Sequence, residues 1–203
     1  MTTQKHFHSS LNYIYPFIIF LLVFSFGNAQ VEEQEFVNSN KPETELPPDI
    51  LWEIKAVRPE ATLKIKGIDS DGHVYDVVAI QNSEDTSVLN VKVLDDDKRL
   101  PVKLIVKGKE PYYPLKAIKE DGSLIAIKAV TQYGDILPVK GISKTGNIIH
   151  IRAIDDGIYY DLIAISPDGQ ENSIKGLKML DTRVETIIHG VKVFAHVKSL
   201  QQD

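Results

Sequence analysis

The chain has 203 residues, a formal net charge of −5 and no cysteine. Because cysteine is absent, a disulfide framework and thiolate metal sites are excluded, and core packing alone must hold the fold together. The acidic balance argues against a nucleic-acid-binding protein, which would carry a basic surface.

Residues 1–29 have the features of a secretory signal peptide. An apolar run from Tyr13 to Phe26 follows a weakly basic start and is too short for a comfortable membrane span. Gly27 and Ala29 supply the small residues that a cleavage site requires. We therefore expect an exported protein, periplasmic or secreted, with no transmembrane segment after cleavage. An uncleaved N-terminal anchor is the alternative.

Residues 30–48 are predicted to form a flexible linker. They contain several acids and prolines and few apolar residues. Such a composition cannot bury enough surface to offset the entropy lost on ordering. Residues 49–203 then form a single domain, which is long enough to bury a real core.

A six-residue pattern recurs about every 12 residues through this domain: apolar, any, apolar, Lys, small, apolar. Alternation with many β-branched residues indicates strands, in which positions 1, 3 and 5 share one face and positions 2, 4 and 6 the other. We expect the 1-3-5 face to form the core. The copies, several of them loose, are 52–57, 63–68, 75–80, 89–94, 100–105, 113–118, 125–130, 137–142, 149–154, 160–165, 172–177 and 195–200.

Glycine-ended turns between the copies predict antiparallel hairpins. Loops 70–72, 120–122, 132–134, 144–146 and 167–169 fit a type I turn closed by a left-handed glycine, and Asp156-Gly157 fits a two-residue type I′ turn. The loop at 120–122 would place Ala117 opposite Ile125 and Leu115 opposite Ile127. The loop at 144–146 would place Gly141 opposite Ile149 and Lys140 opposite His150.

These features predict an all-β fold, an antiparallel meander of about 12 short strands. The meander could close into a barrel, fold into two packed sheets, or extend as one twisted sheet. Position 6 is also apolar in nearly every copy, so partial burial of both faces is possible. Residues 107–111 and 178–190 interrupt the pattern and are read as longer connections, of which the second could carry function.

The lysines at position 4 are the most regular polar feature of the chain. Across a hairpin they face position 2, which places Lys66 opposite Asp76 and Arg152 opposite Asp161. The lysines have two readings: a solvated outer face, or a cationic strip for a polyanion such as an acidic glycan or a lipid headgroup. On the second reading the binding residues are Lys116, Lys128, Lys140 and Arg152, with the outward tyrosines Tyr112 and Tyr159.

No motif for chemistry is present. We find no nucleophile elbow, phosphate loop or zinc signature, and His73, His150, His189 and His196 are scattered singly. Asp69-x-Asp71-Gly72 resembles a calcium loop faintly, but Asp is also the preferred residue before glycine in such turns. The sequence therefore predicts no catalytic residue, no cofactor and no metal site.

The hexads of residues 137–165, the final hexad 195–200 and the Gly-Asn-Ala-Gln signal ending resemble those of an uncharacterised exported β-repeat family of Bacteroidetes-type bacteria. This resemblance implies a domain of unknown function and an exported location, with no activity or site to transfer. Because no catalytic motif is present and the repeat is so regular, we expect a non-catalytic β-repeat module with a binding or scaffolding role in the cell envelope. Its partner would be a glycan or a protein. The alternatives are an envelope carrier of lipid or another apolar ligand, and a glycan-acting enzyme with its site in a barrel mouth.

Overall fold

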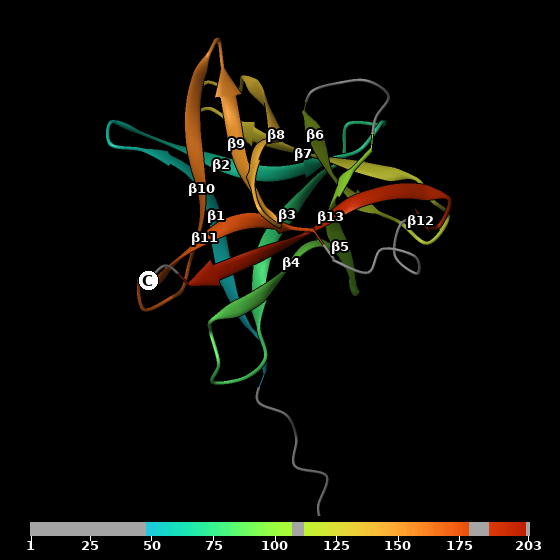
Figure 1. Ribbon diagram of the computed structural model, residues 1–203, viewed down its shortest axis with the longest axis horizontal. Helices are drawn as coiled ribbons and strands as arrows, with labels where there is room; N and C mark the ends of the chain where they lie inside the picture. Colours follow the sequence, from blue (N-terminus) through green and yellow to red (C-terminus); the bar gives the residue numbers. More distant parts are fainter. Residues whose placement is uncertain (1–47, 107–111, 179–186, 202–203) are drawn as a thin grey trace, which may run out of the picture. The chain divides into compact units, whose positions relative to one another are not determined.

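The computed structural model describes residues 48–106, 112–178 and 187–201, and its strands form one antiparallel sheet (Figure 1). The strands are β1 (Ile50–Arg58), β2 (Ala61–Ile68), β3 (Val74–Gln81), β4 (Val88–Asp95), β5 (Lys98–Ile105), β6 (Tyr113–Ile118), β7 (Leu124–Val130), β8 (Ile136–Thr145), β9 (Ile148–Asp155), β10 (Ile158–Ile165), β11 (Glu171–Leu177), β12 (Ile187–Ile188) and β13 (Val191–Gln201). The predicted signal peptide, residues 30–47 of the predicted linker and most of both interruptions lie outside the described residues.

The predicted meander is confirmed. Each strand from β1 to β10 pairs with the next one, and every predicted hexad falls within a strand, with only the short β12 outside the repeat. The turn chemistry is also as predicted: the N–H of Gly122 donates to the carbonyl of Lys119 at 3.0 Å, and the φ of Gly122 is 83°. Asp156 and Gly157 both have positive φ, as a type I′ turn requires.

The predicted loop at 144–146 is wrong. Thr145 pairs with Ile148, so the turn is shorter and falls at residues 146–147, and the register shifts again between Gly141 and Ser143. Gly141 therefore faces Ile151 instead of Ile149, and Lys140 faces Arg152 instead of His150. The faces are unchanged because Ile149 and Ile151 are two residues apart and point to the same side.

At the loop of residues 120–122 one of the two predicted pairs is confirmed. Ala117 faces Ile125, but the pairing with β7 does not reach Leu115, and Tyr113 and Pro114 pair with β8. Strand β6 thus exchanges β7 for β8 part-way along one edge, while β5 pairs with the other edge, and comparable exchanges occur in the other strands of the repeat.

The strands group into four triangles in which three strands pair cyclically. In each triangle, position 5 of one strand faces position 1 of the next, as Ala56 of β1 faces Leu63 of β2. We name them triangle A (β1, β2, β3), triangle B (β4, β5, β13), triangle C (β6, β7, β8) and triangle D (β9, β10, β11).

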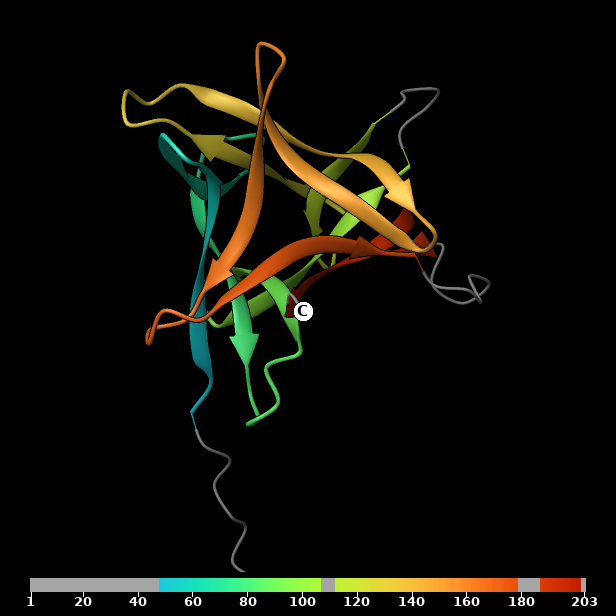
Figure 2. The ribbon, with the colours of Figure 1, turned by 60° about the vertical axis from the view of Figure 1, so that its left-hand side comes forward.

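One strand pair joins each triangle to each of the others, and in every such pair position 4 faces position 4. The facing residues are Lys55 and Ile163, Lys66 and Lys128, Val78 and Lys92, Lys103 and Lys116, Lys140 and Arg152, and Lys175 and Lys198. The triangles are therefore connected like the four corners of a tetrahedron, and the sheet closes on itself. Of the three predicted arrangements, two packed sheets and an open layer are excluded; Figure 2 shows the strands around a common interior.

Positions 1, 3 and 5 fill that interior, as predicted. A Cβ added at Gly141, a position 5, would lie 2.8 Å from Cγ2 of Ile149, and one added at Gly176 would clash with Cδ1 of Leu104. Position 6 is partly buried as well, with Ile118 inaccessible to solvent. Side chains of the domain itself thus occupy the enclosed space, and the polar chemistry lies on the outer face at positions 2 and 4.

Candidate functional site

The outer face of triangle C differs from that of triangle A in its charge. Position 4 of β6, β7 and β8 is lysine in every case: Lys116, Lys128 and Lys140. The residues directly opposite them within the triangle are Ala126, Pro138 and Pro114. In triangle A the corresponding position 2 residues include the acids Glu53 and Asp76. Triangle C therefore concentrates positive charge, and in its strand pairs no carboxylate of the described residues stands directly opposite these three lysines.

Each of these lysines faces a second basic residue across the boundary of the triangle. Lys116 faces Lys103, Lys128 faces Lys66, and Lys140 faces Arg152. We call these six residues the lysine face. Like charges directly opposite each other in a sheet are destabilising, so this arrangement costs stability that an anion could recover.

The outer members of the lysine face have partners within the protein. Lys66 Nζ lies 2.5 Å from an Asp76 carboxylate oxygen, Arg152 is ion-paired with Asp161, and Lys103, which is buried, contacts the His196 ring. The first two pairs confirm the predicted cross-strand positions.

The central lysines are arranged differently. Among the described residues, no carboxylate lies within ion-pair distance of Lys128 or Lys140. Lys140 Nζ lies 5.9 Å from the centroid of the Tyr112 ring, which places an aromatic face beside the cation. The amphipathic ring and the unpaired ammonium groups form a surface suited to a polar, anionic ligand.

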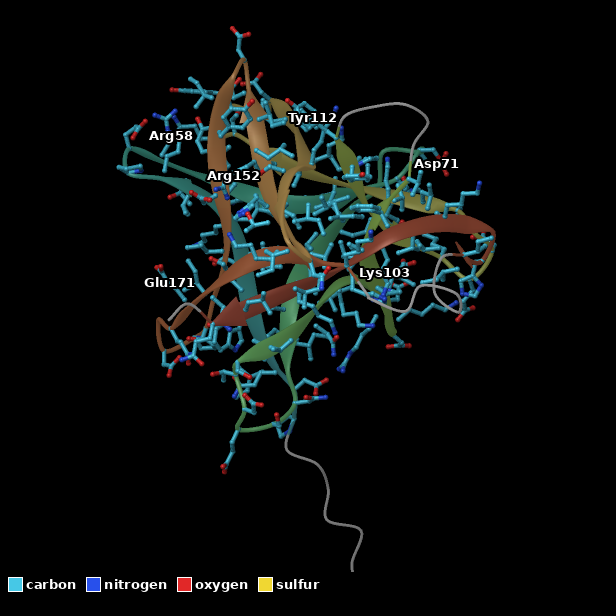
Figure 3. All side chains as sticks on the ribbon, in the orientation of Figure 1. Arg58, Asp71, Lys103, Tyr112, Arg152 and Glu171 are labelled. Carbon is cyan, nitrogen blue, oxygen red and sulfur yellow. The ribbon has the colours of Figure 1, made fainter. Side chains whose placement is uncertain are left out.

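The structure brings most of the predicted binding residues together. Lys140 pairs with Arg152 and lies beside Tyr112, and Lys116 and Lys128 share triangle C with Lys140. Figure 3 shows Arg152, Tyr112 and Lys103 at separate places, so the lysine face spans a broad part of the surface. Tyr159 is exposed but lies farther along the β9–β10 hairpin, opposite Ile154, outside this face.

Sequence reasoning missed a second group of polar residues on triangle D. His150, Asp161 and Ser173 occupy position 2 of β9, β10 and β11 and line one hollow of about 550 Å³. Burial and the nearby cations Lys175 and Arg152 lower the pKa of His150, while Asp161 acts to raise it. The shared repeat position was a signal for this group, because the cyclic pairing brings equivalent positions of three strands together.

The Asp69 turn gathers three possible metal ligands, Asp69, Asp71 and His73, whose ligand atoms lie within 4.8 Å of one another. Oδ1 of Asp69 accepts the backbone N–H groups of Asp71 and His73, and Oδ2 accepts the Tyr75 hydroxyl at 2.8 Å. Although burial acts to raise the pKa of Asp69, these hydrogen bonds hold it well below its ordinary value. Hydrogen bonding within the turn accounts for the cluster, which lies across the domain from Glu171 of β11 (Figure 3).

Residues 48–106, 112–178 and 187–201 include no helix long and apolar enough to cross a membrane. No curated protein and no solved structure shows significant similarity to the chain. Residues 48–200, which include all the strands of the repeat, match the family of unknown function DUF7486, and the chain belongs to that family.

Proposed function

We propose that this domain is a non-catalytic, exported binding module of the cell envelope that binds an acidic glycan through the lysine face. The observation that carries the proposal is the outer face of triangle C, where Lys116, Lys128 and Lys140 face proline and alanine within the triangle. The exported location rests on the signal-like residues 1–29 and on the resemblance to exported proteins of Bacteroidetes-type bacteria.

The charge arrangement supports a ligand with several anionic groups. Lys128 and Lys140 are central to the face and have basic residues, Lys66 and Arg152, across the triangle boundary. An anionic chain lying over these contacts would relieve the repulsion at more than one of them. Such binding gains from each added contact and weakens as salt screens the charges.

A glycan fits this face better than a lipid headgroup does. Small or rigid side chains lie between the half-buried lysine stems: Pro114, Ala126 and Pro138. The Tyr112 ring lies beside Lys140. Of the large apolar side chains exposed in the described part of the chain, Ile136 lies on this face, two residues before Pro138 in β8. One such side chain is little to insert among lipid tails, so the cations and the tyrosine ring favour a sugar chain.

The packed interior argues against an apolar-ligand carrier. Leu104 and Ile149 occupy the space that a side chain at Gly141 or Gly176 would need. A carrier of this size would require an unfilled, apolar cavity, whereas the hollows at triangles A and D lie on the outer face and have charged residues in their linings.

Affinity electrophoresis or calorimetry with polygalacturonate, dextran sulfate and neutral dextran tests the proposal. We expect binding to both charged polymers, none to neutral dextran, and a marked loss between about 50 and about 500 mM NaCl. The variant Lys128→Gln/Lys140→Gln should bind about tenfold more weakly, since each exposed ion pair contributes up to about 0.7 kcal/mol.

Lys55→Gln is the matched control. Lys55 occupies position 4 of β1 but is 3.0 Å from Glu53 and faces Ile163, so its loss should leave polymer binding unchanged. Equal binding of neutral dextran, or equal losses in both variants, would overturn the proposal. Preferential binding of vesicles containing an anionic phospholipid would replace it with a membrane-surface function.

A further inference from the structure

The hollow on triangle D has a mixed lining, which we call the D hollow. Its polar residues are His150, Asp161, Ser173, Lys175 and Gln201, and its apolar residues are Ile148 and Leu200. The cyclic pairing of triangle D brings β9, β10 and β11 together here, and β13 of triangle B joins them by pairing with β11.

Positive charge is in excess around the D hollow. The carboxylate of Asp161 is engaged by Arg152. Lys175 faces His150 on one neighbouring strand and Lys198 on the other. No carboxylate therefore stands directly opposite Lys175 on either side.

The surroundings of Lys175 disfavour the protonated, charged form of its side chain. Burial lowers the pKa of its ammonium group, Arg152 lowers it further, and Asp161 acts in the opposite direction. A bound anion would stabilise the charged form, so anion binding and protonation of Lys175 favour each other.

The equivalent hollow of triangle A has a different arrangement of charges. It has a volume of about 310 Å³ and is lined by Glu53, Lys64, Lys66 and Asp76. Lys66 is paired with Asp76, and Glu53 with the neighbouring Lys55. Lys66 and Glu53 of triangle A thus each have an opposite charge beside them, whereas Lys175 of triangle D has only basic residues across its two strand pairs.

We propose that the D hollow binds a small molecule with one anionic head group, a phosphate or a carboxylate, and a compact apolar body. The ammonium of Lys175 and the imidazole of His150, whose Nε2 lies 3.3 Å from Oγ1 of Thr145, flank the head group. Ile148 and Leu200 line the part of the hollow that receives the apolar body. An ammonium group and an imidazole N–H suit an oxyanion, and the mixed lining is typical of small-molecule sites.

Amide NMR titration with phenyl phosphate, phenylacetate, inorganic phosphate and benzyl alcohol tests this site. We expect saturable shifts at residues 148–150 and 173–175 with one or both aromatic anions, and the stronger of the two identifies the head group. Inorganic phosphate should bind more weakly because it has no apolar body. Benzyl alcohol should leave these amides unshifted.

Lys175→Gln should weaken binding of the preferred anion at least about tenfold, and Lys175→Arg should retain most of it. Lys92→Gln is the matched control because Lys92 is another position 4 lysine whose pKa burial lowers, and it lies in triangle B. The acidic-glycan affinity of Lys175→Gln should equal that of the wild type, since Lys175 is outside the lysine face, so the two proposals fail separately.

Three outcomes would overturn the inference. One is the absence of shifts around the D hollow with both aromatic anions, and another is equal weakening by Lys92→Gln and Lys175→Gln. The third is benzyl alcohol binding as tightly as the anions. If Lys175→Gln does not fold, His150→Ala provides the same test, with His73→Ala, an exposed histidine of triangle A, as its control.

Discussion

Lys66 of β2 lies directly opposite Lys128 of β7, and the residues on either side of this pair explain the size pattern of the repeat. Ile65 faces Ala129, so a large position 3 meets a small position 5. Within its triangle, position 5 also faces the large position 1 of the next strand, as Ala129 faces Leu137. The small residue is therefore required by two neighbours at once, one inside its triangle and one outside.

The Lys66–Lys128 contact should cost stability. Position 4 tolerates apolar residues, since Val78 and Ile163 occupy it in other strands. Lys128→Val should raise the free energy of unfolding by about 0.3 to 1 kcal/mol at low salt, because it removes a like-charge pair and suits a strand. Urea unfolding at low and high NaCl measures this gain.

Salt dependence separates the two causes of that gain. Relief of repulsion should shrink in high salt, whereas improved strand propensity should not. Lys92→Val is the control because Lys92, another position 4 lysine, faces Val78 and Pro101, so no directly opposed like charge is removed. A gain in Lys128→Val that is equal at all salt concentrations would contradict the repulsion argument.

The close packing at Gly176 gives a second prediction. A Cβ there would clash with Leu104 and lie 3.0 Å from Cβ of Ile149. Gly176→Ala should therefore lower the free energy of unfolding by about 1 to 3 kcal/mol through overpacking. Denaturant unfolding measures the loss.

A double variant tests the cause. Leu104→Val removes the methyl group that the new Cβ would meet, so Gly176→Ala/Leu104→Val should be more stable than the sum of the two single effects predicts. Strict additivity would show that the glycine is required for another reason.

Local patterns were sufficient to predict the strands, their faces and most of the hairpins. Alternation assigns positions 1, 3 and 5 to the core, and a glycine such as Gly122 sets its loop because the turn needs a positive φ. The strand pairs that join one triangle to another could not be predicted from these local patterns. Pairing Gly141 with Ile149 or with Ile151 buries the same faces, so the hydrophobic pattern cannot choose between the two registers.

The candidate sites also differ in whether local sequence patterns could predict them. Lys116, Lys128 and Lys140 were predictable because they repeat at one position of consecutive strands. His150 and Ser173 belong to hexads separated by β10 and meet only because β11 returns to pair with β9. That closure is a non-local property, and turn chemistry carries no information about it.

A buried hydroxyl in the core provides a third prediction. Ser199 occupies position 5, usually a small residue, and its Oγ is buried with no hydrogen-bond partner among the described residues. Ser199→Ala should be neutral or should stabilise the fold by up to about 1 kcal/mol, since an unsatisfied polar group is removed.

Ser166→Ala is the contrasting variant. The Ser166 hydroxyl accepts the backbone N–H of Gln170 at 2.7 Å and contacts Asp168, so its loss should cost about 1 kcal/mol. Thermal or urea unfolding compares the two variants. A destabilised Ser199→Ala would show that the hydroxyl has a partner in solution.

The Asp69 turn provides the final prediction, a dependence of stability on pH. Burial acts against the charged carboxylate, but hydrogen bonds from Tyr75, His73 and Asp71 outweigh it and hold the pKa of Asp69 below its value in the unfolded chain. A group with a depressed folded-state pKa stabilises the fold fully above its unfolded pKa, and the contribution falls as pH decreases toward the folded pKa. Wild-type stability should therefore decline below about pH 4 partly through Asp69.

In Asp69→Asn that part of the decline is absent, so the stability difference from the wild type should be constant near neutral pH and shrink in acid. Asp71→Asn retains the Asp69 carboxylate and should keep the wild-type slope. A difference between wild type and Asp69→Asn that stays the same down to about pH 3 would contradict the role assigned to this carboxylate.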